Sequence, residues 1–120
     1  MAKQDVVIRQ AAVRLADAEA VNDLLQRLPS SISENLRLEL ERSGGAGFSG
    51  MRYHSETNRA FWFAADGQHL LCVTLPSLTE EDAARIWDKI DRHQCGGDIT
   101  GIAKVYDAVT GFKAEVTTRI

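Results

Sequence analysis

Two apolar runs joined by a turn signal constrain the fold of this chain more than any other feature of its sequence. Residues 60–65 and 68–75 are mostly apolar, and Asp66-Gly67 lies between them. An Asp-Gly pair accepts the positive φ angles of a two-residue turn, so the spacing predicts a β-hairpin in which Ala65 pairs with Gln68. Successive side chains of a strand point to opposite faces. Both faces of this hairpin are then apolar, and both must be covered.

The predicted register divides the large apolar side chains between the two faces of the hairpin. Phe61 and Phe63 share one face with Leu70 and Cys72. We predict that the other face includes an interaction surface, because aromatic and aliphatic residues anchor protein interfaces. The residues of this predicted surface are Trp62, Leu71, Val73 and Leu75.

Composition indicates an ordinary globular protein. The chain has 120 residues, of which 44% are hydrophobic and 26% charged, and its formal net charge is −3. We expect one domain over residues 1–120. A mildly acidic chain without a basic run disfavours sequence-independent nucleic-acid binding. No stretch has the length or apolar character of a membrane span or a signal peptide, and two cysteines are too few for a disulfide scaffold, so we expect a cytoplasmic protein.

Helical spacing of apolar residues predicts two helices in the first third of the chain. The first is expected from about residue 9 to residue 28, with residues 5–8 open between helix and strand because three of them are β-branched. The second is expected over residues 32–42, after a capping box formed by Ser31 and Glu34. Within residues 34–42 a strand remains an alternative, because leucines alternate at Leu36, Leu38 and Leu40.

The rest of the chain predicts a strand over residues 51–54, the central hairpin, a helix over residues 79–93 capped by Thr79, and a C-terminal hairpin. That last hairpin pairs residues 99–106 with residues 112–120, in which apolar and polar side chains alternate. The predicted element order is α-α-β-β-β-α-β-β. It describes an α+β domain with an antiparallel sheet of about five strands, a meander plus the C-terminal hairpin, packed with two or three helices.

One segment resembles a known family. Residues 8–25 resemble the opening strand and helix of acetyltransferases that use acetyl-coenzyme A. The family's pyrophosphate-binding segment, in which spaced glycines open a helix, has no counterpart after the central strands. We therefore do not assign the chain to this family.

Three groups of residues are candidates for chemical sites. Gly45, Gly47 and Gly50 form a literal G-x-G-x-x-G, which is typical of nucleotide binding only between a strand and a helix and is otherwise a loop. Arg52, His54 and Arg59 lie near the predicted meander turn and could contact an anion, although such residues are commonly a solvated turn. The cysteines and histidines do not match metal-ligand spacing, and Cys95 follows a helix C-terminus, which does not favour a thiolate. We predict no metal, cofactor or catalytic residue.

These observations favour a non-enzymatic protein–protein interaction module, meaning a small regulatory, inhibitory or adaptor protein that forms a homodimer. The alternative is a small-molecule or nucleotide-binding domain, or a small enzyme, that acts on an anionic ligand through the glycines and arginines named above. A second alternative is a nucleic-acid-binding accessory protein, for which the candidate contacts are Arg9, Arg14, Arg37 and Arg42.

Overall fold

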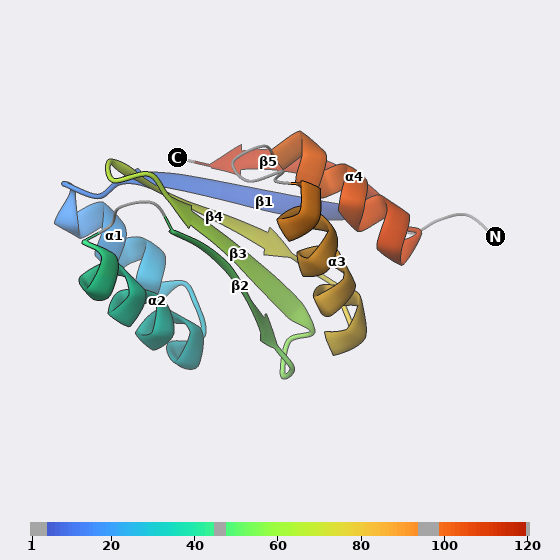
Figure 1. Ribbon diagram of the computed structural model, residues 1–120, viewed down its shortest axis with the longest axis horizontal. Coiled ribbons are helices and arrows are strands. Elements are labelled where there is room, and N and C mark those ends of the chain that lie inside the picture. The colour runs from blue at the N-terminus through green and yellow to red at the C-terminus, as the bar shows by residue number, and fades with distance from the viewer. Residues whose placement is uncertain (1–4, 45–47, 94–98, 120) are drawn as a thin grey trace.

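The computed structural model describes residues 5–44, 48–93 and 99–119. In these residues five strands form one sheet in the order β2-β3-β4-β1-β5, flanked by four helices (Figure 1). Strands β2, β3, β4 and β1 run antiparallel, and β5 is parallel to β1. The predicted α+β class is confirmed. The elements are β1 (Asp5–Arg14), α1 (Ala18–Gln26), α2 (Ser30–Ser43), β2 (Phe48–His54), β3 (Arg59–Ala65), β4 (His69–Leu75), α3 (Glu80–His93), α4 (Ile99–Thr110) and β5 (Lys113–Arg119).

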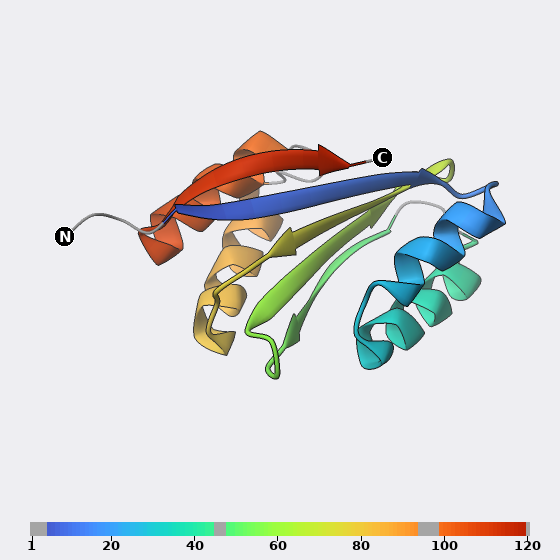
Figure 2. The ribbon, with the colours of Figure 1, turned by 180° about the vertical axis from the view of Figure 1, so that it is seen from behind.

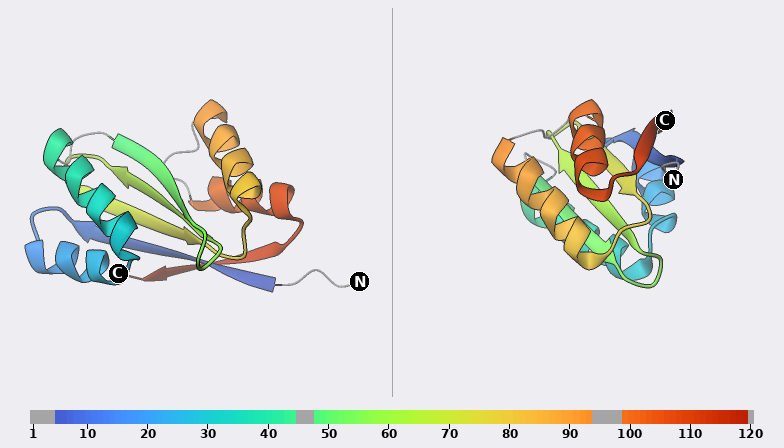
Figure 3. Two further views of the ribbon diagram at one scale, coloured as in Figure 1. Left: turned by 90° about the horizontal axis from the view of Figure 1, so that it is seen from below. Right: turned by 90° about the vertical axis from the view of Figure 1, so that its right-hand side faces the viewer.

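The helices cover the sheet in two pairs, one on each face. Buried residues of α1 and α2 pack on Phe61, Phe63 and Cys72, and buried residues of α3 and α4 pack on Trp62 and Val73. The two pairs are also displaced towards opposite ends of the sheet (Figure 3). Each face of the central hairpin is therefore covered by helices of the same chain.

The central hairpin has the predicted faces, but its register differs by two residues. Ala65 pairs with Leu70 rather than Gln68, and Trp62 pairs with Val73. The cause is the Asp66 side chain, whose Oδ1 accepts the backbone N–H groups of Gln68 and His69 at 2.9 and 2.6 Å. This Asx turn places Asp66 before the tight loop instead of inside it. A shift of two residues keeps every side chain on its predicted face.

The prediction of helix from residue 9 was wrong, because β1 extends through Arg14. This strand lies inside the sheet, where it pairs with β4 on one side and β5 on the other. Ile8 is fully buried at this position. Backbone pairing on both sides outweighs the weak helical spacing of the segment. Helix α1 begins only at Ala18, where Oδ1 of Asp17 accepts the Ala20 N–H at 3.1 Å.

Helix α2 is confirmed as a helix, although it begins without the predicted capping box. Its N-cap is Pro29, which has no capping side chain. Ile32 and Leu36 are buried one turn apart, whereas Leu38 is 50% exposed. The alternating leucines of this segment therefore lie on different sides of a helix rather than on one face of a strand.

The predicted C-terminal hairpin was also wrong, because residues 99–110 form helix α4. Ile102, Ala103 and Tyr106 are buried at spacings of one, three and four residues, which is one face of a helix. Gly111 ends this helix at φ +76°, and its N–H donates to the Asp107 carbonyl. Strand β5 then runs parallel to β1, a pairing that a hairpin cannot make.

Helix α3 is confirmed over Glu80–His93. The Thr79 hydroxyl accepts the Asp82 N–H at 3.1 Å, and the acidic residues of the first turn oppose the positive end of the helix dipole. Ala83, Ile86 and Ile90 are buried against the sheet. Trp87 is only half-buried at the border of this stripe. That position brings Trp87 to the edge of the sheet.

Candidate functional site

Strand β2 forms one edge of the sheet. It pairs with β3 along its whole length, and no described strand pairs with its other side. An edge strand presents backbone N–H and C=O groups that can pair with a further strand. The sequence of β2, Phe-Ser-Gly-Met-Arg-Tyr-His, contains no proline and one residue with a permanent charge, Arg52. It therefore has little of the protection that edge strands commonly carry.

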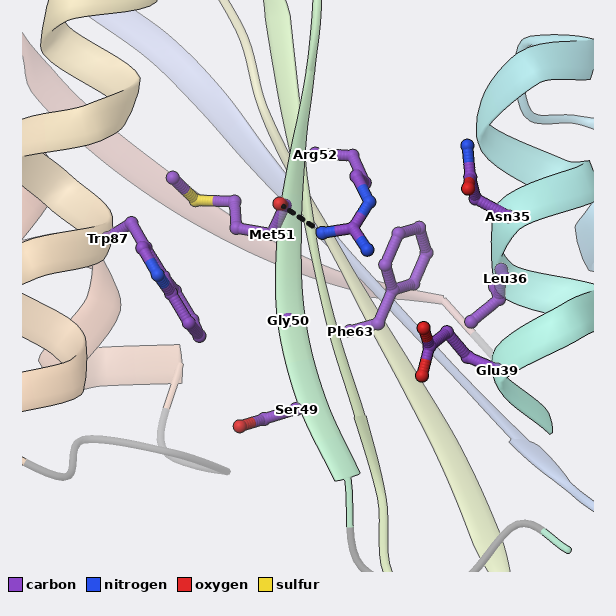
Figure 4. Close-up of a pocket in the computed structure, with 9 residues that line it drawn as sticks. All are labelled: Asn35, Leu36, Glu39, Ser49, Gly50, Met51, Arg52, Phe63 and Trp87. Carbon is purple, nitrogen blue, oxygen red and sulfur yellow. Dashed lines mark hydrogen bonds between the residues drawn. The ribbon is translucent and has the colours of Figure 1, made fainter. Parts of the chain in front are cut away.

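A cleft of about 210 Å³ follows this edge and receives side chains from both helix layers (Figure 4). Trp87 of α3 lies on one side of β2, and residues of α2 lie on the other. The residues that line the cleft are Asn35, Leu36, Glu39, Ser49, Gly50, Met51, Arg52, Phe63 and Trp87. Edge strand and cleft together form a slot with a helix along each wall.

The two walls of the cleft differ chemically. On the α3 side, Met51 and Trp87 are half-buried and pack against the core. On the α2 side, Arg52, Asn35 and Glu39 are among the lining residues, and Arg52 Nη1 donates to the Met51 carbonyl at 3.1 Å (Figure 4). A segment beside β2 would thus meet apolar groups on one face and polar or charged groups on the other.

Gly50 leaves the middle of the edge open. A Cβ atom added there would meet only the Arg52 Nη1 atom within 4 Å, at 3.9 Å, which is ordinary van der Waals contact. Its φ angle is not in the left-handed region. Position 50 therefore accepts a side chain without strain, which makes it a suitable place to alter the edge.

The predicted interaction surface lies in the core of the chain. Trp62, Val73 and Leu75 are 1%, 0% and 0% exposed, and Leu71 is half-buried against the same cluster. Helices α3 and α4 cover these residues. A partner reaches them only if a helix moves away, so they do not form an exposed contact surface.

The predicted anion-binding residues are separated by the fold. Arg52 and Gly50 line the β2 cleft, whereas Arg59 lines a different groove. His54 is engaged locally, with its Nδ1 atom 3.0 Å from the Thr57 hydroxyl and its Nε2 atom 4.0 Å from Glu56. Gly45 and Gly47 lie outside the described residues. The glycine motif runs into strand β2 rather than a helix, which is not the arrangement of a dinucleotide site.

The arginines considered for nucleic-acid binding come from two elements. Arg9 and Arg14 belong to β1, and Arg37 and Arg42 belong to α2. Arg9 shares a groove with Arg27 and Arg59, a grouping that the sequence did not indicate.

Cys72 is not suited to be a nucleophile. Burial raises the pKa of its thiol to about 12, so the thiol stays protonated at neutral pH. Cys95 lies outside the described residues. Among the described residues, no three His, Cys, Asp or Glu side chains are arranged to hold a metal ion. Within the same residues, none of the helices has both the length and the apolar character needed to cross a membrane.

Comparisons with protein-family models, with curated proteins and with solved structures found no match to this chain. Sequence reasoning missed the cleft because it did not single out Trp87, which follows Ile86 at the apolar stripe of α3, and did not consider Asn35 or Glu39. The one available signal was the position of Trp87 beside Ile86, at the border of that stripe.

Proposed function

We propose that this chain is a non-enzymatic protein-interaction module that binds through the edge of strand β2. The observation that carries the proposal is the bare edge, which lies between walls from α2 and α3. Strand addition to an exposed edge is a common mode of protein recognition: the backbone supplies hydrogen bonds, and side-chain pockets supply specificity. The partner in this proposal is an extended strand.

A second copy of this chain is the first partner to consider. If two β2 strands pair antiparallel with Met51 opposite Met51, all seven residues of each strand are paired. Gly50 of one copy then faces Arg52 of the other, and no like charges lie opposite one another. Met51 and Trp87 of both copies gather on one side of the joined sheet. Such an interface is self-complementary, as a two-fold dimer requires.

Charge substitutions at position 50 test this pairing. Gly50→Arg places like charges opposite each other twice in the dimer, whereas Gly50→Glu places opposite charges there with similar bulk. We expect the dimer dissociation constants of these two variants to differ roughly tenfold, with Gly50→Arg the weaker dimer. Native mass spectrometry and sedimentation over a concentration series measure the constants.

Two further variants complete the design. Asn22→Arg adds the same charge at an exposed position of α1, away from the edge, and should leave the dimer dissociation constant unchanged. Trp87→Ala should weaken the dimer at least tenfold, because buried aromatic anchors dominate interfaces. A thermal melt of each variant verifies its fold. Equal dissociation constants for Gly50→Arg and Gly50→Glu would contradict the proposed register.

A wild-type chain that stays monomeric across the series would contradict self-pairing. In that case, a displayed library of unstructured peptides is panned against the wild type and against Gly50→Arg. Peptides that bind only the wild type would support an interaction module with a different partner. No enrichment on the wild type would contradict the module itself.

A further inference from the structure

A second concave site lies on the face of the sheet that carries α1 and α2. These helices cover one end of that face, and β1, β4 and β3 continue beyond them (Figure 2). A groove of about 810 Å³ opens there. It shares no lining residue with the cleft at the β2 edge.

The sheet register sets the floor of this groove. Arg9 of β1 and Phe61 of β3 both pair with Thr74 of β4, so the three side chains form one row across the sheet on the same face. Arg59 lies two residues before Phe61, on that face as well. Arg27 joins them from the C-cap of α1. Three arginines from three elements therefore surround one patch of floor.

The described residues that line the groove include no Asp or Glu that would offset this charge, and Glu115 of β5, opposite Val7 in the sheet, is not one of them. The ion pairs of the described chain are made by other residues, and Arg9, Arg27 and Arg59 have none. All three are exposed. Convergent positive charges in a concave site concentrate the electrostatic potential there and favour an anion. This local charge is opposite in sign to the net charge of the chain, which is −3.

The groove is not uniformly polar. Val7, which is 43% exposed, lies at its border, and Phe61 forms part of its floor. The hydroxyl groups of Thr57, Thr74 and Ser77 add neutral hydrogen-bonding groups among the lining residues. Small-molecule sites commonly combine an apolar lining with a few charged or polar groups, in volumes of roughly 300–1,000 Å³.

We propose that this groove binds a small molecule that carries two or more phosphate or carboxylate groups. Guanidinium groups hold both kinds of anion through paired hydrogen bonds, and the apolar part of the molecule would lie on Val7 and Phe61. A small ligand fits the observations better than nucleic acid does. Three arginines in one concave site neutralise few phosphates, and the surrounding chain is acidic overall.

Isothermal titration calorimetry with two probes, tripolyphosphate and citrate, tests the site. We expect saturable one-to-one binding of at least one probe, weaker at about 200 mM than at about 50 mM NaCl. Arg9→Gln, Arg27→Gln and Arg59→Gln should each raise the dissociation constant roughly tenfold. Tighter binding of tripolyphosphate would identify a phosphorylated ligand class, and tighter binding of citrate a polycarboxylate class.

Arg37→Gln removes the same charge at an exposed position of α2, outside the groove, and should change the dissociation constant of the probe less than about twofold. Gly50→Arg should also leave probe binding intact, which separates this site from the β2 edge. Amide shifts in the nuclear magnetic resonance spectrum of the wild type locate the probe without any substitution, and we expect them at Arg9, Phe61 and Thr74. Absence of binding, equal weakening by Arg37→Gln, or shifts elsewhere would overturn the proposal.

Discussion

The two faces of the sheet bury their side chains to different extents. Among the described residues, the largest fully buried side chains are Trp62, Tyr106, Ile8, Leu70, Leu75, Leu78, Ile86, Ile102 and Val73. All of these except Leu70 belong to the cluster under α3 and α4. The opposite face has its own core under α1 and α2. Beyond these helices, that face carries the groove lined by Arg9, Arg27 and Arg59, called the arginine groove below.

This difference indicates a division of roles within one sheet. A closed apolar cluster supplies stability in proportion to the area that it removes from water, and it has no accessible surface to which a ligand could bind. A face that is covered at only one end keeps part of its floor accessible while the covered end holds it rigid. Binding groups are placed well when a packed scaffold supports them.

The largest effect is expected from truncating neighbouring aromatic residues that point to opposite faces. Trp62→Ala should lower the free energy of unfolding by about 3–5 kcal/mol, because it leaves a cavity in the closed cluster. Phe61→Ala should cost about 1.5–3 kcal/mol, because Phe61 adjoins the groove and water can fill the space that it leaves. Urea denaturation of both variants measures the difference. A larger cost for Phe61→Ala would contradict the comparison.

A smaller effect is expected at the hydrogen bond that links the two faces. The Tyr106 hydroxyl of α4 donates to the carbonyl of Pro76, a residue that lines the groove. Tyr106→Phe should cost about 1 kcal/mol by urea denaturation, because the Pro76 carbonyl loses its partner. Burial, with Asp107 and Asp82 nearby, raises the pKa of Tyr106 from 10.0 to about 12. Wild-type stability should therefore fall as the pH rises from 10.0 to about 12, and Tyr106→Phe should lose less over that range.

Local signals in the sequence predicted the elements whose structure is determined locally. The Asp-Gly pair between two apolar runs identified the hairpin, the alternating side-chain direction of a strand gave its faces, and Thr79 with the acids after it identified α3. The hairpin register was wrong by two residues, because hairpin geometry depends on how the Asp66 side chain bonds to the backbone. That choice is made within the turn and cannot be read from the residue types alone.

The two incorrect predictions, a helix from residue 9 and a C-terminal hairpin, have a non-local cause. Strand β1 is held by β4 and β5, which follow it by about sixty and about a hundred residues in the chain. Without those partners its spacing fits a helix as well as a strand. The parallel pairing of β5 with β1 was not predicted either. Without it, residues 99–106 were assigned as the hairpin partner of residues 112–120, whereas they belong to helix α4. The groove lined by Arg9, Arg27 and Arg59 could not be predicted for the same reason. These three residues are far apart in the sequence, and the register of the strands brings them together.

Thiol reactivity tests how deeply the groove is open. Cys72 lies among the groove residues, yet it is buried and its pKa is raised to about 12. At about pH 8 roughly one thiol in ten thousand would be ionised. In a Cys95→Ser background, we expect a thiol-reactive disulfide reagent to modify Cys72 only as fast as the protein unfolds. Rapid modification of the folded protein would show that the floor opens further than the structure indicates.

The smallest effect is expected at the hairpin turn, which belongs to neither face. The backbone N–H groups of His69 and Gln68 hold the pKa of Asp66 below its usual value of 3.8. Because the folded pKa is the lower one, its stabilising contribution is present above about pH 4 and is lost as the pH falls through the folded value. Asp66→Asn keeps an acceptor oxygen without the charge. Its urea midpoint should therefore lie below that of the wild type at neutral pH and approach it in acid. Asp66→Ala, which removes the acceptor, should stay below the wild type at both pH values. A constant difference between wild type and Asp66→Asn at every pH would mean that the charge of Asp66 does not support the turn.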